Sequence, residues 1–176
     1  MNDQTPHLRD LLPIDRYLWT LDIVQREGKH LRYSWKTLFE RQPPIDADWI
    51  GRLEDYPDDA IKLEAFVSRY GRMQDTLADK LIPRWLQSLA ERTGSQLENL
   101  NRAERLGVIE STEEWLAARK LRNQLVHEYM EDSHAFMGAL ENAREHALML
   151  ISTYNNVRNY SRDNLNVDEH RLPPSL

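Results

Sequence analysis

Hydrophobic residues recur at helical spacing along most of the chain, and stretches with two-residue alternation are scarce. The first long segment of this kind covers about residues 14–41 and stops before Pro43 and Pro44. A second one covers residues 58–81. Because proline is absent from both segments and glycine is rare in them, each predicts one amphipathic α-helix.

The remaining sequence continues the helical pattern. Pro83 is expected to force a kink or a new start, after which helix resumes up to Gly94. Ser111 and Glu114 stand at the spacing of a capping box, which marks a helix start. Further helical segments are predicted over residues 48–55, 99–106, 115–129 and 133–160. The pattern predicts an all-α fold, a single up-and-down bundle of four to five main helices.

The length of 176 residues gives room for one domain with a proper core. We expect this domain over residues 14–161, after a flexible N-terminus of residues 1–13. Residues 162–176 are polar and contain two prolines, which predicts a frayed C-terminal tail.

Composition excludes several classes of protein. The chain has no cysteine, which rules out disulfides, thiolate metal sites and cysteine nucleophiles. No stretch approaches 18 consecutive apolar residues and the N-terminus lacks an apolar signal region, so we expect no membrane span and a cytoplasmic location. The formal net charge of −6 argues against a general nucleic-acid binder, so any contact with RNA must use a local cluster of Arg and Lys.

One charged side chain interrupts the apolar face of the predicted 115–129 helix. That face comprises Trp115, Ala118, Leu121, Leu125, Val126 and Tyr129. At about 100° per residue, Arg122 falls inside this arc. Because burying an unpaired guanidinium is costly, such an arginine usually extends to solvent or pairs with a carboxylate of a neighbouring helix. The alternative is a role in binding or catalysis.

His127 lies about 140° around the helix axis from Arg122. Asn123 precedes His127 by one turn and is placed to orient its imidazole. One copy of the helix cannot easily direct Arg122 and His127 at the same atom, whereas two copies related by a twofold axis can. A site built on these residues therefore favours a homodimer through this helix.

The string RNQLVHEY, from Arg122 to Tyr129, has the R-x4-H-x-Y form of the HEPN superfamily motif. It closely resembles the HepT-like toxins found beside minimal nucleotidyltransferase (MNT) antitoxins. R-x4-H alone is a weak signal. The polar Asn123 directly after the arginine, the tyrosine two residues after His127, and the long helix that follows make it more specific.

The resemblance implies a homodimer in which the two motifs meet in a cleft, and RNA cleavage with neither a metal nor another cofactor. It implies that Arg122 and His127 are catalytic and that Asn123 supports them. Tyr129 resembles the tyrosine to which an MNT-type nucleotidyltransferase antitoxin adds AMP, which silences the toxin. A plain core or interface aromatic is an equally good interpretation of Tyr129.

The residue types suit this chemistry. RNA supplies its own nucleophile, the ribose 2′-hydroxyl, and the reaction leaves a cyclic phosphate. Histidine exchanges protons near neutral pH, and the planar guanidinium of arginine matches phosphate oxygens. We therefore expect Arg122 to bind the phosphate and His127 to act as general acid or base. DNA, which lacks the 2′-hydroxyl, should not be cut.

Two other functions stay open. The first is a non-catalytic HEPN module that binds a nucleotidyltransferase or its substrate, and the second is a helical adaptor that assembles with another protein through its apolar faces. We expect no metal, because Asn142 and His146 share a helical face but have no further ligands at a recognisable spacing.

Overall fold

Helices account for every regular element in the part of the chain that the structure describes. The structure is a computed structural model, and it describes residues 11–127 and 132–176. The α-helices are α1 (Pro13–Phe39), α2 (Ala47–Gly51), α3 (Pro57–Thr76), α4 (Ile82–Ser88), α5 (Gln96–Arg105), α6 (Thr112–His127) and α7 (Ser133–Asn164). Short helical turns are η2 (Leu53–Asp55), η3 (Leu77–Leu81) and η4 (Glu169–Arg171). The predicted all-α fold is confirmed.

Local signals explain where these helices begin. Proline occupies the first turn of α1 and of α3, where its missing N–H would have no partner within the helix. Asp132 caps α7 by accepting hydrogen bonds from the backbone N–H groups of His134 and Ala135. Ser95 and Glu98 form a complete capping box at the start of α5, so this helix begins three residues earlier than the sequence pattern predicted.

Pro83 does not interrupt the helix that contains it. The chain stays helical from α3 through η3, a π-helical turn, into α4, and the N–H of Ile82 donates to the carbonyl of Leu77. A π-turn inserts an extra residue and so accommodates the proline ring and its missing donor without a new start. The predicted kink or restart therefore takes the form of a π-turn within one long helical unit.

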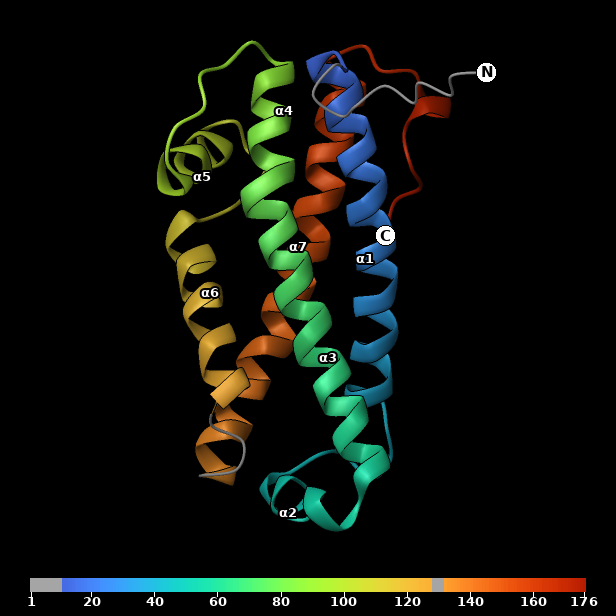
Figure 1. The fold of residues 1–176 in the computed structure, drawn as a ribbon, viewed down its shortest axis with the longest axis vertical. Coiled ribbons are helices and arrows are strands. Elements are labelled where there is room, and N and C mark those ends of the chain that lie inside the picture. The colour runs from blue at the N-terminus through green and yellow to red at the C-terminus, as the bar shows by residue number, and fades with distance from the viewer. Residues whose placement is uncertain (1–10, 128–131) are drawn as a thin grey trace, which may run out of the picture.

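Four long helical units run along the bundle in alternating directions (Figure 1). They are α1, the unit from α3 to α4, α6 and α7, with α5 as a shorter fifth helix beside the end of α4. The short helix α2 closes the opposite end. This is the predicted up-and-down bundle of four to five main helices, in which α6 packs against both α3 and α7.

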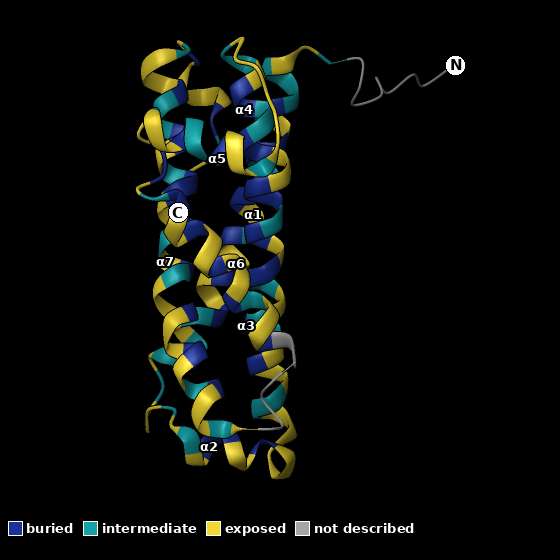
Figure 2. Cartoon of the chain, turned by 90° about the vertical axis from the view of Figure 1, so that its left-hand side faces the viewer, coloured by how far each residue is buried: buried dark blue, intermediate teal, exposed yellow. Residues whose placement is uncertain are grey.

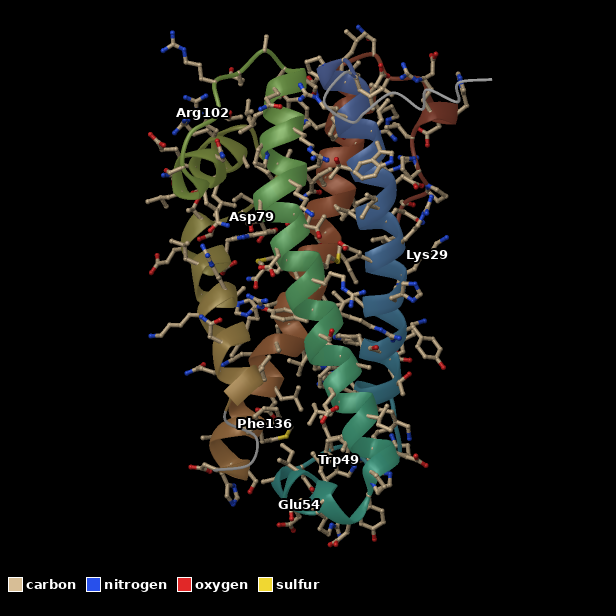
Figure 3. All side chains as sticks on the ribbon, in the orientation of Figure 1. Lys29, Trp49, Glu54, Asp79, Arg102 and Phe136 are labelled. Atoms are coloured by element: carbon tan, nitrogen blue, oxygen red, sulfur yellow. The ribbon has the colours of Figure 1, made fainter. Side chains whose placement is uncertain are left out.

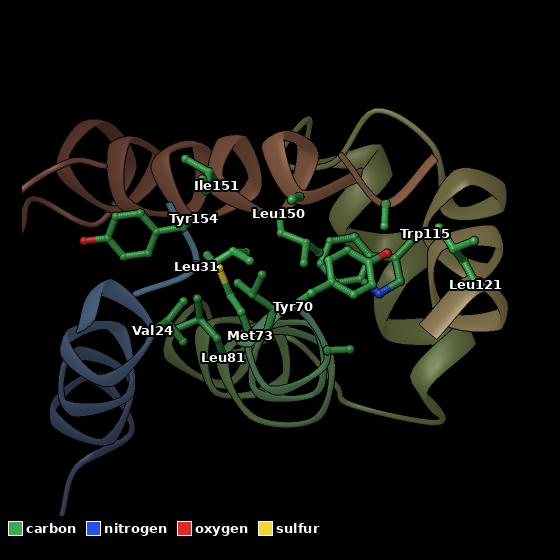
Figure 4. Packing of buried hydrophobic residues seen from close by; sticks show 14 of the residues in the cluster. Val24, Leu31, Tyr70, Met73, Leu81, Trp115, Leu121, Leu150, Ile151 and Tyr154 are labelled. Carbon is green, nitrogen blue, oxygen red and sulfur yellow. The ribbon is translucent and has the colours of Figure 1, made fainter. Parts of the chain in front are cut away.

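The core runs the length of the bundle, and buried positions of each helix face inward (Figure 2). Tyr70 lies beside Trp115 in the core, and Met73 packs on the side of α3 that faces Val24 and Leu31 of α1 (Figure 4). Trp85 and Trp115 are fully buried, as packing residues would be, whereas Trp19 is about half exposed. Burying a large apolar side chain contributes roughly 1.5–3 kcal/mol, so these contacts fix α6 against α3.

The C-terminal tail is not frayed, and the prediction for residues 162–176 is wrong. Helix α7 continues to Asn164, and the chain then folds back onto the bundle. Tyr154 donates a hydrogen bond to the carbonyl of Pro174 at 2.8 Å, and Asn155 exchanges hydrogen bonds with the backbone of Leu176 at 3.0 and 2.9 Å. Arg158 donates to the carbonyl of Pro173 at 2.6 Å. Prolines stiffen this segment, and side chains of α7 satisfy its backbone.

Within the described residues, no helix combines the length and the apolar composition needed to cross a membrane.

Candidate functional site

Helix α6 carries the candidate residues. Arg122 is partly buried, with 37% of its side chain exposed, and Asn123 is exposed. Helix α6 ends at His127, but the side chain of His127 and all of Tyr129 lie outside the described residues. The roles predicted for His127 and Tyr129, and the support of Asn123 for His127, therefore stay predictions.

Arg122 reaches across to α3. Its Nη2 atom lies 3.0 Å from Oδ2 of Asp75, whose side chain is 43% exposed. This is the ion pair with a neighbouring helix that an arginine on an apolar face usually makes. Pairs this exposed contribute only about 0–1 kcal/mol to stability, because water screens them. The contact thus holds the guanidinium in place but leaves it available to a stronger partner.

Gly71 provides the space that Arg122 occupies. A Cβ atom at residue 71 would lie 2.8 Å from Nε of Arg122 and 3.4 Å from its Cγ and Cδ. The arginine stem therefore lies directly on the α3 backbone, one turn before Asp75. Glycine within a helix costs about 1 kcal/mol of stability relative to alanine. At residue 71, glycine is what allows the side chain of Arg122 to approach the α3 backbone this closely.

A hydrogen bond ties α3 to the turn of α6 that precedes Arg122. The hydroxyl of Tyr70 donates to the carbonyl of Ala118 at 3.1 Å, and both residues are fully buried. Burial raises the pKa of the Tyr70 phenol well above its ordinary value, so it stays a neutral donor. Because Ala118 lies one turn before Arg122, this bond helps to fix the position of the arginine over α3.

A groove of about 590 Å³ opens beside Arg122, between α3, α6 and the start of α7. Its apolar side is lined by Leu63, Val67, Leu125 and Phe136. Its polar side is lined by Glu64, Ser68, Arg72, Asp75 and Arg122. Figure 3 labels Phe136 at the start of α7, below the end of α6. The groove combines an apolar wall that suits a planar ring with two guanidinium groups that suit phosphate oxygens.

A second polar connection crosses from α6 to the same side of the bundle. Arg119 donates to the side-chain oxygen of Gln96, and Gln96 donates to Oδ1 of Asp79 at 2.6 Å. Asp79 lies in η3, four residues after Asp75, and is labelled in Figure 3 near α5 and α6. Arg119 precedes Arg122 by three residues, so the two arginines extend from neighbouring turns of one helix.

Asn142 and His146, at which the sequence predicted no metal, lie elsewhere, beside a cavity of about 210 Å³ between α6 and α7. Burial lowers the pKa of His146, partly offset by the charges of Glu114 and Glu145. Across residues 11–127 and 132–176, no three His, Asp or Glu side chains are grouped so that they could hold a metal ion.

Sequence reasoning singled out Arg122 and Asn123 but missed the residues of α3 that surround the arginine. Gly71, Arg72 and Asp75 are not part of any motif. One available signal was Gly71 itself, a glycine in the middle of a periodic helical segment, which often marks a close approach. Asp79 and Gln96 carried no comparable signal.

Comparison with known proteins finds no family model, no curated protein and no solved structure that matches this chain.

Proposed function

We propose that this chain is a metal-independent endoribonuclease, the toxin of a HEPN/MNT toxin–antitoxin pair. The proposal starts from the resemblance of the segment between Arg122 and Tyr129 to the R-x4-H-x-Y motif. The structural observation that supports it is the setting of Arg122. Its guanidinium lies at the edge of a groove, is more than a third exposed and pairs with the partly exposed carboxylate of Asp75.

In the proposed reaction, the ribose 2′-oxygen loses its proton and attacks the adjacent phosphorus. The bond from phosphorus to the 5′-oxygen breaks, the leaving oxygen takes up a proton, and a 2′,3′-cyclic phosphate remains. Arg122 binds the phosphate and offsets the negative charge that develops on its oxygens. His127 carries one of the two protons, as general acid or base.

The active unit in this proposal is a homodimer formed through α6, which brings His127 of one copy toward Arg122 of the other. A phosphate would exchange with Asp75 as the partner of Arg122. That exchange is inexpensive, because an exposed Arg–Asp pair contributes at most about 1 kcal/mol. The MNT-type nucleotidyltransferase would silence the enzyme by adding AMP to Tyr129, and the added phosphate would compete for Arg122.

Cleavage of RNA by the purified protein in EDTA tests the proposal. We expect the parent to cut RNA and leave a cyclic phosphate, and His127→Ala to be inactive. His170→Ala is the matched control, because His170 is an exposed histidine of η4, the short red helix that Figure 1 shows at the other end of the bundle. DNA of the same sequence should stay intact. A folded parent, shown by mass spectrometry to carry no AMP, that cuts none of the RNAs would refute the nuclease.

The second candidate is a non-catalytic HEPN module that binds a nucleotidyltransferase or its substrate. The observation in its favour is that Arg122 already has a carboxylate partner, as a structural arginine would. This candidate predicts an inactive parent that still binds the nucleotidyltransferase, with His127→Ala binding equally well.

A further inference from the structure

Two connections between α6 and the α3–η3 helix follow one another along the bundle. Arg122 contacts Asp75 directly, and Arg119 contacts Asp79 through Gln96. The two helices run antiparallel, so the lower number on α6 faces the higher number on α3 and η3. The result is a polar seam on two consecutive turns: Arg122 is paired with Asp75, and Arg119 is linked to Asp79 through the side chain of Gln96, the first residue of α5.

The spacing of these arginines is that of one helical turn. Three residues of α-helix rise about 4.5 Å, and four residues rise about 6 Å. Long arginine side chains can widen this separation, so both guanidinium groups can reach successive phosphates of an extended single strand. Arg119 and Asp79 are exposed and Gln96 is half buried, so water and ligands have access to this second connection.

A carboxylate such as that of Asp75 resembles an RNA phosphate group in charge and in the geometry of its oxygens. A guanidinium that pairs with a carboxylate is held in the extended position from which it can also pair with a phosphate. The amide of Gln96 adds a neutral hydrogen-bond donor beside Arg119. Both arginines are therefore positioned before RNA arrives, and a phosphate oxygen can replace Asp75 at Arg122 and the amide oxygen of Gln96 at Arg119.

We propose that Arg119 and Gln96 form a second phosphate-binding position, one helical turn from Arg122, for the single-stranded RNA substrate. The strand follows the seam between α3 and α6, and the exchangeable partners are Asp75 at Arg122 and the side-chain oxygen of Gln96 at Arg119. This inference rests on the proposed function, in which Arg122 binds the phosphate that reacts. It explains how a chain of net charge −6 could bind RNA, through a few local contacts.

The test measures binding of a single-stranded uridine oligonucleotide whose 2′-O-methyl groups prevent cleavage. Fluorescence anisotropy gives Kd for the parent, Arg119→Gln and Lys120→Gln over a range of salt concentrations. Lys120 is the matched control, because it is the next residue of α6, is also exposed, and lines the cavity between α6 and α7. Both substitutions remove one positive charge.

We expect Arg119→Gln to weaken binding by about tenfold and to lower the slope of log Kd against log salt by about 0.7, the value for one phosphate contact on a single strand. Lys120→Gln should change neither quantity. Asp79→Asn should tighten binding, since it removes a negative charge that lies next to Gln96 and repels a phosphate at this position. A purely structural connection would instead leave the salt slope unchanged when Arg119 is replaced.

Two results would overturn the inference: equal effects of Arg119→Gln and Lys120→Gln on the salt slope, or no binding of the oligonucleotide by the parent. Cleavage by the parent in the RNA assay, together with either result, refutes the second position and leaves the nuclease standing. Conversely, a reduced slope for Arg119→Gln in a protein that cuts no RNA supports the phosphate position and refutes the nuclease.

Discussion

Replacing Gly71 with alanine should separate the stability of the fold from the function of Arg122. The new methyl group would lie 2.8 Å from Nε of Arg122, which is closer than such atoms approach one another. The atom it meets belongs to a long, flexible side chain, so the arginine moves and the helices do not. We therefore expect Gly71→Ala to fold normally with Arg122 displaced from Asp75.

The stability of this variant can be estimated from two opposing effects. Alanine gains about 0.5–1 kcal/mol over glycine in a helix interior, through the lower entropy of the unfolded chain. Losing the exposed pair between Arg122 and Asp75 costs about 0.2–1 kcal/mol. The free energy of unfolding of Gly71→Ala should therefore stay within about 1 kcal/mol of the parent value, and a small increase is the expected sign.

RNA cleavage should respond quite differently. A displacement of about 1 Å at a group that binds the reacting phosphate can cost up to about 100-fold in rate. We expect a loss of between tenfold and 100-fold in kcat/KM, in a protein whose urea unfolding curve is almost unchanged.

Gly138→Ala is the matched control, because Gly138 lies within α7 and a Cβ atom there meets nothing within 4 Å. It should gain the same helix propensity and keep full cleavage activity. Equal activity of the two alanine variants would show that the position of Arg122 on α3 does not matter to the reaction. A loss of stability beyond about 2 kcal/mol in Gly71→Ala would show that the helices, not the arginine, have to move.

Four further substitutions test the fold. Tyr70→Phe should lower the free energy of unfolding by about 1 kcal/mol in urea, because a buried hydrogen bond to α6 is lost. Ala90→Gly should raise it by about 0.5–1 kcal/mol, since Ala90 lies just after the end of α4 at a φ of 58°. Gly107→Ala, at a φ of 75°, should lower it. A hydrogen bond from Lys62 helps to lower the pKa of Asp59 to about 2, below the unfolded value of about 3.9. The stability that this shift contributes is present above pH 4 and is lost as pH falls toward 2. Between these pH values, the free energy of unfolding of Asp59→Asn should therefore fall by about 1–2 kcal/mol less than that of the parent.

The sequence predicted those features that depend on one helix at a time. Periodicity identified the long helices and the buried face of α6, since a helix that packs on one side must repeat its apolar residues every three or four positions. The same geometry placed Arg122 within that face, and the structure has it partly buried. The pairing of Arg122 with a carboxylate of a neighbouring helix was also among the predicted outcomes.

Features that depend on how two helices meet were not predictable in this way. Which carboxylate faces Arg122 depends on the packing register of α3 and α6, and Asp75 has several equally suitable acidic neighbours in the sequence. The C-terminal tail was mispredicted for a related reason. Its prolines and polar residues are typical of a free end, but α7 supplies donors and acceptors for its backbone at Tyr154, Asn155 and Arg158.

The proposed chemistry requires an arginine that is both held in place and free to change partner. A deeply buried pair with Asp75 would hold Arg122 too strongly, because breaking such a pair costs about 3–5 kcal/mol. A fully solvated arginine would have to lose its side-chain entropy each time it bound a phosphate. The exposed pair lies between these extremes, and salt weakens it and an arginine–phosphate contact alike. Geometry then decides which partner binds, and Gly71 sets that geometry by letting the arginine lie flat on α3.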